Sequence, residues 1–543
     1  MERTREVLKS RPEKIDLPGF ELALPPSKIP GDLAANIALA LAKEVKGSPR
    51  DLAQKIAGGI SDNPITEKID VVGPGFLNFW IKDSALREEL SVILGGDKPK
   101  PSAKGAGEKI LMEFVSANPT GPLHIGHGRG AALGDSLSRV FKWLGQSVAT
   151  EFYINDAGGQ IRNLGLSMEA RIKELKGEKL EFPEGGYQGS YVVDLAKEAL
   201  ASGKKFKPIE PAQMLFTEGD LAGFAAVRIL KMIQKDMDDF AVHFDNWTRE
   251  SDLHKKHLVE DLFQKLKKKN HVYEEGGAFW FRATEFGDEK DRVLKKASEA
   301  PTYFASDIAY HNDKFARGFQ KLINIWGADH HGYAQRLKGA LKAIDHDPDD
   351  LVIILNQLVS IKGGRLSKRA GDMITLREVM DEVGKDATRF FFALRSPGAH
   401  FEFDLDLAKK QANDNPVFYV QYVHARCCSI FAEAAKRGLS IEPLAWQKLS
   451  AGLPALHESE KAVILHLMLF RETVELCARD YSNHHLTVYL LELAGKFHSF
   501  YEQCRVLEDD PQLRTFRLDL VRAIRDRVKE GLALLGVSAP DKL

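Results

Sequence analysis

The sequence predicts a multidomain α/β protein: a Rossmann-like parallel-sheet domain with helical insertions, a small α+β domain before it and an all-α domain after it. The length of 543 residues is too great for one ordinary hydrophobic core. Between residue 109 and about residue 395, strand-like and helical patterns alternate, which is typical of a parallel sheet. After residue 415 the apolar spacing is almost wholly helical.

The N-terminal domain is predicted to span residues 1–94. Around the turn Gly73-Pro74-Gly75, the patterns predict helices at 36–42 and 51–60 and strands at 69–72 and 76–81. The stretch 95–107, GGDKPKPSAKGAG, is rich in Gly, Pro and Lys and has no periodicity. Such a composition predicts a linker between domains.

The central domain is predicted to span residues 108–400. Its expected strands include 110–115, 149–154, 321–326 and 351–358. Residues from about 165 to 292 are mostly helical and charged in pattern, which predicts insertions into the sheet domain. The remaining residues, 401–543, form the predicted all-α domain.

Composition and charge exclude several classes of protein. Apolar residues make up 44% of the chain and charged residues 28%, which argues against disorder. No apolar run approaches the roughly 18 residues of a membrane span, and the first residues lack a signal-peptide core, so we expect a cytoplasmic protein without a membrane partner. Lys and Arg total 76 against 77 Asp and Glu, so local patches must bind any polyanion. The four cysteines contain no C-x-x-C pair, which indicates neither a disulfide framework nor a structural zinc site.

The most informative stretch is FVSANPTGPLHIGHGRG at residues 114–130, where a predicted strand runs into a loop and then into a helix. The N-terminus of such a helix presents unpaired N–H groups and a positive dipole end, and Gly126 and Gly128 allow close approach of a phosphate. His124 and His127 add hydrogen-bond donors. The stretch predicts a nucleotide site, and so short a motif needs supporting context.

A glycine-flanked basic loop at residues 363–371 supplies that context. Paired with the histidine loop, it resembles the second signature of class I aminoacyl-tRNA synthetases, in which a KMSK-type loop closes over ATP held by a HIGH-type loop. Here the loop reads Arg365-Leu366-Ser367-Lys368, so its first two positions depart from the family pattern while the serine and the final lysine remain. The resemblance therefore implies a role for Lys368 and leaves the first basic position without one.

The resemblance becomes specific because the chain is similar to bacterial-type arginyl-tRNA synthetases over nearly its whole length. The matching stretches are 117–127 (ANPTGPLHIGH), 153–162 (YINDAGGQIR), 191–198 (YVVDLAKE), 277–311, 326–335 (WGADHHGYAQ) and 366–383 (LSKRAGDMITLREVMDEV). The resemblance implies an arginine-tRNA ligase, which activates arginine with ATP, accompanied by Mg²⁺, and transfers it to the terminal adenosine of its tRNA.

The resemblance also implies the residues that handle ATP. Activation needs alignment and stabilisation of charge on the phosphoryl oxygens rather than covalent help. His124, His127 and Lys368 are implied as catalytic donors. The implied ATP-binding residues are His124, Gly126, His127, Gly327, Asp329, His330, Ser367 and Lys368. The adjacent histidines at 330 and 331 lack a third ligand at suitable spacing, so no metal site is predicted.

An arginine pocket should contain carboxylates, because a guanidinium is planar, permanently charged and donates parallel N–H bonds. The family positions implied for the substrate arginine are Glu113, Asn118, Tyr303, Asp307 and Gln335. These assignments come from the resemblance and not from spacing.

The same resemblance implies contacts with a tRNA specific for arginine. Residues 1–94 correspond to the domain that contacts the tRNA elbow, with its first helix shortened or absent, and residues 401–543 to the anticodon-binding domain. The candidate tRNA-binding residues are Tyr419, Tyr422, Arg426, Arg522 and Arg525. For Arg522 and Arg525, solvated charges on an amphipathic helix are the favoured interpretation of either residue alone, because Asp526 and Glu530 interleave with them. The chain is expected to be a monomer.

Two alternative functions remain open at this point. Another class I ligase, such as a cysteinyl or glutamyl enzyme, is disfavoured by the missing zinc cysteines and the long leading domain. A non-catalytic tRNA-binding or arginine-sensing relative is disfavoured by intact His124, His127 and Lys368.

Overall fold

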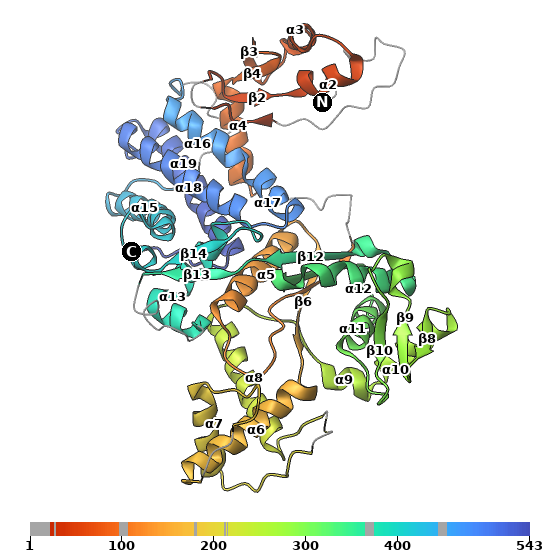
Figure 1. The fold of residues 1–543 in the computed structure, drawn as a ribbon. Coiled ribbons are helices and arrows are strands. Elements are labelled where there is room, and N and C mark those ends of the chain that lie inside the picture. Colours follow the sequence, from red (N-terminus) through yellow and green to blue (C-terminus); the bar gives the residue numbers. More distant parts are fainter. Residues whose placement is uncertain are drawn as a thin grey trace.

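The computed structural model describes residues 22–26, 29–96, 107–178, 182–210, 213, 215–363, 374–443 and 453–543 (Figure 1). The predicted linker therefore lies almost wholly outside the described residues, as does the region where the first helix of the N-terminal domain was expected to be shortened or absent. No helix in the described part of the chain is both long and apolar enough to cross a membrane.

An antiparallel sheet and its helices form the N-terminal domain at the top of Figure 1. The sheet has the order β1-β2-β4-β3, with β1 (Leu22–Ala23), β2 (Leu33–Ala35), β3 (Thr66–Val72) and β4 (Phe76–Ile81). The helices are α2 (Ile37–Val45), α3 (Pro49–Ile60) and α4 (Asp83–Leu94). Gly75 in the β3–β4 turn has a φ of 141°, and a Cβ there would lie 2.8 Å from the carbonyl oxygen of Pro49. The turn therefore requires glycine at this position.

The central domain is built on a parallel sheet with the order β12-β11-β5-β6-β7. Its strands are β5 (Lys109–Glu113), β6 (Ser147–Ile154), β7 (Asn246–Arg249), β11 (Lys321–Gly327) and β12 (Leu351–Asn356). All four strand pairs are parallel. The carboxyl ends of neighbouring β5 and β11 therefore lie at one edge, and such edges bind ligands in this type of fold.

Strand β5 leads through the histidine loop into α5 (Ile125–Trp143), which packs closely on the end of the strand segment. A Cβ on Gly134 would lie 2.2 Å from the ring of Phe114, so only glycine allows this approach. The strand ends at Glu113, two residues before the predicted end, because Val115 and Ser116 have φ angles of 70° and 40°. This bend lets the hydroxyl of Ser116 donate to Oε1 of Glu113 at 2.8 Å.

The region from about residue 165 to 292, predicted as mostly helical insertions, contains both helices and strands. The region contains or adjoins α6 (Gly158–Leu175), α7 (Ser190–Ala201), α8 (Leu221–Asp239), α9 (Glu250–Lys255) and α10 (Leu258–Lys268). Strand β7, however, belongs to the main sheet, and β8 (Val272–Glu275), β9 (Ala278–Phe281) and β10 (Arg292–Lys295) form a separate antiparallel sheet. Strand β7 reads NWTR and has no apolar run, so its extended conformation depends on pairing with β6. Helices α11 (Tyr303–Ala316) and α12 (His331–Ala343) follow.

A strand pair crosses the predicted boundary between residues 400 and 401. Strand β14 (Phe401–Asp404) pairs in parallel with β13 (Val359–Lys362) of the preceding domain, so the all-α part begins after it. Between these strands lies α13 (Leu376–Ala393), which is kinked at Gly384, where φ is 79°. The short helix α14 (Leu405–Ala408) follows β14.

The C-terminal part is helical and lies between the N-terminal and central domains in Figure 1. Its helices are α15 (Pro416–Lys436), α16 (Glu458–Met468), α17 (Phe470–Arg479), α18 (His484–Gln503) and α19 (Pro511–Leu534). Helix α4 of the N-terminal domain packs on α16 and α19, where Asp83 accepts the amide of Leu456 at 2.8 Å and pairs with Lys461 at 3.2 Å. The predicted fold class is confirmed.

Candidate active site

The histidine loop caps the N-terminus of α5 through two reciprocal hydrogen bonds. Nδ1 of His124 accepts the amides of Gly126 at 3.0 Å and His127 at 3.4 Å, while Nδ1 of His127 accepts the amide of His124 at 3.3 Å. The two rings stack with their centroids 3.6 Å apart. A Cβ on Gly126 would lie 2.9 Å from the His124 ring, so the residue at position 126 must be small. The sequence His-Ile-Gly-His therefore builds a rigid cap.

Both histidines are neutral in this arrangement. Burial lowers the pKa of His124, and burial together with the proximity of His124, which disfavours a second positive charge, lowers the pKa of His127 to about 3. Since both Nδ1 atoms accept main-chain N–H groups, the remaining ring proton of each is assigned to Nε2. Each ring therefore offers one neutral Nε2–H donor.

Main-chain hydrogen bonds join the histidine loop to the segment that follows the predicted second signature. The amide of Ile125 donates to Ile374 at 3.0 Å, and the amide of Leu376 donates to Leu123 at 2.8 Å. Thr375 caps α13 and exchanges hydrogen bonds with Glu378. Residues before position 374 in that loop, including the predicted Ser367 and Lys368, lie outside the described residues.

A cleft of about 540 Å³ opens beside this junction. It is lined by the histidines, by the loop before them, by the start of α7 and by the first turn of α13. The predicted Asn118 lines the cleft, and its amide donates to Gln160 of α6 at 2.5 Å. Tyr191 of α7 donates its hydroxyl to the carbonyl of Thr120 at 2.6 Å, and burial raises the pKa of Tyr191 to about 12. The insertion therefore forms one side of the cleft.

Asp307, on α11, is a buried carboxylate held by two side chains. Tyr333 donates its hydroxyl to Oδ2 at 2.7 Å, and Nδ1 of His311 lies 3.1 Å from Oδ1. Burial alone would raise the pKa of Asp307, but His311, Tyr333 and Lys314 together lower it. The carboxylate is therefore ionised and oriented before any ligand arrives.

Glu113, at the end of β5, is linked to the same network. The ammonium group of Lys314, whose side chain is fully buried, pairs with Oε2 of Glu113 and lies 3.4 Å from the amide oxygen of Asn324. The amide nitrogen of Asn324 donates to Nε2 of His311 at 2.8 Å, which leaves Nδ1 of that ring to donate to the main-chain carbonyl of Asp307 at 2.8 Å, with Oδ1 of the carboxylate at 3.1 Å. Lys314, Asn324 and His311 thus link Glu113 to Asp307.

A third carboxylate, Glu250 at the start of α9, was not predicted. Its side chain is buried, its Oε2 has no hydrogen-bond partner, and Nε2 of His254 lies 3.8 Å from Oε1. Burial raises the pKa of Tyr153, and the charges of Glu250, Asp307 and Glu113 add to that rise. Three acids therefore lie near Tyr153, and Lys314 is a buried ammonium group among them. The excess of negative charge favours a cationic ligand.

The other two predicted arginine-binding residues are more exposed. Tyr303, in the first turn of α11, is 56% exposed, and its ring centroid lies 6.2 Å from that of Tyr333. Gln335 is exposed on α12, two residues after Tyr333. Residues two apart do not share a helix face, so Gln335 does not lie beside the hydroxyl that holds Asp307.

The predicted ATP residues after β11 lie at the carboxyl edge of the sheet. Gly327 ends the strand, and Asp329 and His330 belong to the 3₁₀ helix η2 (Ala328–His330) with side chains 81% and 51% exposed. A Cβ on Gly327 would lie 2.4 Å from Oδ1 of Asp329, so a larger residue here would displace that exposed side chain. As far as the described residues define it, the histidine cleft is lined by none of the three.

The predicted tRNA-binding residues fall into two groups, one on α15 and one on α19. Tyr419 and Tyr422 both stack on His498 of α18, with centroid distances of 5.0 and 6.0 Å, and Arg426 donates to the hydroxyl of Tyr501 at 2.6 Å. By contrast, Arg522 and Arg525 of α19 each place their guanidinium 5.0 Å from the ring of Phe431. Both also contact acids, Asp519 and Asp526, which favours a structural role for this second group.

A sequence signal for the missed residues exists in α11. Asp307, His311 and Lys314 are spaced i, i+4 and i+7, so they share one helix face, and all three are buried. A polar stripe on the buried face of a helix points to a site. No comparable signal marks Glu250 or Tyr333, because each is a single residue in a short polar stretch.

Comparison with known families gives three matches along the chain. Residues 2–81 match the arginyl tRNA synthetase N terminal domain, residues 89–392 match the catalytic domain of class I (R) tRNA synthetases, and residues 420–543 match the DALR anticodon binding domain. The catalytic match alone covers more than half of the chain.

Individual relatives agree with these matches. An arginine–tRNA ligase of Carboxydothermus hydrogenoformans is 44% identical over 96% of this chain and 94% of the relative, and one of Geobacter sp. strain M21 is 45% identical over 97% and 96%. A putative arginyl tRNA synthetase structure from Campylobacter jejuni is 35% identical, has a TM-score of 0.75 and covers 85% of this chain and all of that one. The arginyl-tRNA synthetase structure of Thermus thermophilus is 23% identical, with a TM-score of 0.77 and coverage of 100% and 99%, and its likeness shows the fold.

Proposed function

The chain belongs to the class I arginyl-tRNA synthetases, and from this premise we propose which of its residues carry the ligation of arginine to tRNA. The enzyme is an arginine-tRNA ligase. The carboxylate of arginine attacks the α-phosphorus of ATP, which gives arginyl-adenylate and releases pyrophosphate. A ribose hydroxyl of the terminal adenosine of tRNA then attacks the acyl carbon and releases AMP.

The guanidinium of arginine binds among Asp307, Glu113 and Glu250. The observation that supports this most directly is that Asp307 is buried, ionised and fixed by His311 and Tyr333 before substrate arrives. A carboxylate so held accepts charge-assisted N–H bonds without reorganisation. Glu250 contributes the orphaned buried oxygen that a further N–H donor would satisfy. Asn118 lies nearer the reacting end of the substrate, with Tyr303 and Gln335 at the rim of the pocket.

His124 and His127 donate from Nε2 to the phosphate oxygens of ATP as negative charge develops on them. Their neutral state is an advantage because the donors need no counter-charge and do not titrate near neutral pH. Gly126 allows the histidine pair to stack, and Gly327, Asp329 and His330 contact the adenosine at the adjacent strand end.

Lys368, with Ser367, steadies the pyrophosphate that leaves. The segment 374–376, which follows Lys368 in sequence, is hydrogen-bonded to the histidine loop, and this supports the proposed role. Mg²⁺ accompanies ATP and is held chiefly by the phosphates, because this ion keeps several water ligands and needs few protein ligands. Replacing Lys368 by Ala slows adenylate formation far more than it raises the Michaelis constant for arginine.

The terminal domains hold the tRNA. Residues 1–94 contact its elbow, and residues 401–543 contact its anticodon, with Tyr419, Tyr422 and Arg426 forming a surface on which unpaired bases stack. Arg522 and Arg525 support Phe431 and contribute positive potential. The enzyme acts in the cytoplasm as a monomer.

The direct test is arginine-dependent exchange of labelled pyrophosphate into ATP, measured with and without arginine tRNA. Exchange in the presence of arginine, ATP and tRNA is expected. If exchange requires tRNA, the RNA completes the active site. No exchange under either condition, with folded protein that still binds tRNA, would favour a binding protein that lacks catalysis.

A further inference from the structure

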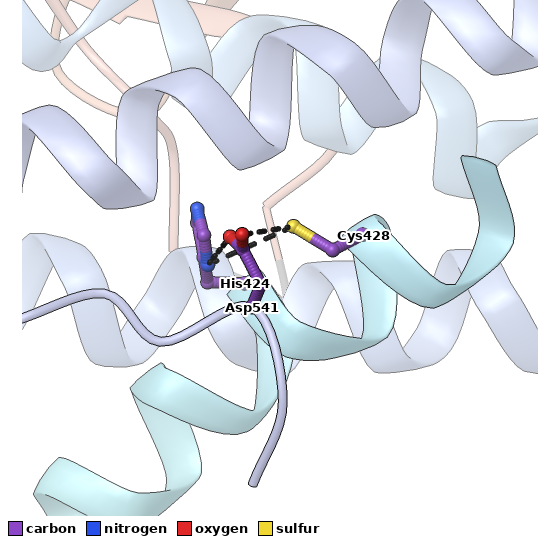
Figure 2. A group of neighbouring side chains, drawn as sticks. All are labelled: His424, Cys428 and Asp541. Atoms are coloured by element: carbon purple, nitrogen blue, oxygen red, sulfur yellow. Dashed lines mark hydrogen bonds and ion pairs between the residues drawn. The ribbon is translucent and has the colours of Figure 1, made fainter. Parts of the chain in front are cut away.

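Three side chains of different chemistry meet on the face of α15 next to the C-terminal tail (Figure 2). Sγ of Cys428 lies 3.4 Å from Oδ1 of Asp541 and 3.9 Å from Nδ1 of His424, and that Nδ1 lies 4.0 Å from the same carboxylate oxygen. His424 is 1% exposed, Cys428 is partly buried, and the side chain of Asp541 is 80% exposed. One member is therefore fixed in the core while another faces solvent.

The helix spacing explains why two of the groups converge. His424 and Cys428 are four residues apart and so lie one above the other on α15. The tRNA-facing residues Tyr422 and Arg426 are two residues from His424 in either direction and therefore point elsewhere. The cluster is thus separate from the surface proposed to contact RNA.

We propose that His424, Cys428 and Asp541 bind one Zn²⁺ ion, with a fourth position open to water. A tetrahedral zinc with bonds of about 2.0 to 2.3 Å requires its ligand atoms to be about 3.3 to 3.8 Å apart, and the three observed separations lie at or slightly above this range. A thiolate with an imidazole selects zinc over the hard ions Mg²⁺ and Ca²⁺. The exposed carboxylate leaves a route for the ion to enter.

The proton and charge balance of binding is straightforward. Cys428 loses its thiol proton to solvent, and the imidazole proton, which Nδ1 of His424 now donates to the carbonyl of Pro540 at 3.0 Å, moves to Nε2. The thiolate and carboxylate together neutralise the two charges of the ion. Arg525 and Lys529 of α19, whose charges reach Cys428, therefore face a neutral complex rather than a bare cation.

Zinc at this site would fasten the C-terminal tail. After α19 the tail contacts two helices before it reaches the cluster. The hydroxyl of Ser538 donates to Asp386 of α13, and the carbonyl of Ser538 accepts the side-chain amide of Gln421 of α15 at 2.9 Å. The side chain of Asp541 is 80% exposed and contacts Cys428 and His424, so a shared metal ion would hold the end of the tail against α15. The inference does not depend on the ligase activity.

Cobalt binding to the full-length, chelator-treated protein tests the site, because Co²⁺ replaces zinc and its thiolate complex absorbs in the near ultraviolet. One equivalent of Co²⁺ is expected to give a thiolate band that one equivalent of Zn²⁺ removes and excess Mg²⁺ leaves unchanged. Cys428→Ser should abolish the band, and Asp541→Asn should weaken binding at least ten-fold. Cys504→Ser should retain it, because that thiol lies beside Ser459 instead.

Two outcomes would overturn the proposal. One is the absence of a thiolate band in the wild-type protein, and the other is a band that persists with unchanged affinity in Cys428→Ser. Asp541→Asn alters an exposed tail residue, so its result stands even if the cysteine variant fails to fold.

Discussion

At the scale of single residues, the proposed substrate pocket depends on two buried acids. Glu113 pairs with Lys314. Burial alone would raise the pKa of Asp307, but His311, Tyr333 and Lys314 lower it and so favour the charged form. A neutral replacement of Asp307 would keep the shape of the pocket and remove that charge. Such a change should weaken substrate binding while leaving the fold intact.

Asp307→Asn is expected to raise the Michaelis constant for arginine about ten- to a hundred-fold, since a hydrogen bond to a charged group contributes about 1.5–3 kcal/mol. The Michaelis constant for ATP should change little. Steady-state pyrophosphate exchange measures both. Asp313→Asn is the matched control, because Asp313 lies on the same helix and pairs with Arg317 at 3.0 Å. Equal losses for arginine and ATP in Asp307→Asn would contradict a specific role.

The histidine loop makes stability depend on pH in a predictable direction. The pKa of His127 is about 3 in the folded protein and near 6.5 when unfolded, so between these values only the unfolded chain takes up the proton. Stability is therefore fully present above pH 6.5 and falls as the pH drops toward 3. In His127→Gln, which can still accept the capping amide, the urea midpoint should fall less steeply below pH 6.5. Parallel pH profiles for the two proteins would refute this assignment.

The residues of the pocket could be predicted only in part. Glu113 and Asp307 were identified through the family resemblance, whereas Tyr333, Lys314 and Glu250 were not, because their roles arise from contacts between elements distant in sequence. The assignments themselves remain predictions, and those of Ser367 and Lys368 concern residues outside the described part of the chain.

At the scale of elements, the close contact between α5 and α13 sets the position of the histidine loop relative to the first turn of α13. A Cβ on Gly128 would lie 2.5 Å from Cδ1 of Leu376, the first residue of α13. By contrast, a Cβ on Gly130, in the same helix, would meet Asn356 at an ordinary 3.7 Å. Glycine is therefore required at one position and dispensable at the other.

Gly128→Ala is expected to lower the thermal midpoint and the rate of arginine activation, because overpacking of this kind costs about 1–3 kcal/mol. Gly130→Ala should leave activation unchanged and stability equal or slightly higher, since alanine favours helix. Adding Leu376→Ala to the first variant should restore part of the loss. If the two glycine variants behave alike in calorimetry and pyrophosphate exchange, the contact does not position α13.

The elements themselves were predicted where periodicity is strong. Strands β5, β6 and β11 and the helical C-terminal part follow from apolar patterns. Strands β7 and β14 were missed because each has four residues and is defined by its pairing partner, β6 or β13, rather than by its own sequence.

At the scale of the whole molecule, one buried arginine joins three parts of the chain. Arg389 of α13 donates to the carbonyls of Leu535 at 2.9 Å and Phe240 at 3.0 Å and pairs with Asp135 of α5. Its side chain is fully buried, and burial lowers its pKa. The helical domain, the insertion and the sheet domain therefore share one charged contact.

Arg389→Met is expected to lower the thermal midpoint by several degrees, because it breaks a buried ion pair and leaves the carbonyls of Leu535 and Phe240 without their donor. Breaking such a pair costs about 3–5 kcal/mol, and the cost here should lie toward the lower end because Arg139 still pairs with Asp135 at 2.8 Å. Hydrogen exchange should increase near Leu535 and Phe240. Arg437→Met removes an exposed pair with Glu433 and should cost less than about 1 kcal/mol, so it serves as the control. Similar calorimetric midpoints for the two variants would argue against a shared junction.

The most direct test of the central account compares charging of arginine tRNA with labelled arginine and with labelled citrulline, the neutral isostere in which a urea replaces the guanidinium. If buried carboxylates select the substrate, the protein charges tRNA with arginine and discriminates against citrulline by at least about a thousand-fold. Comparable charging with both amino acids, or none with arginine by the folded protein, would contradict the account.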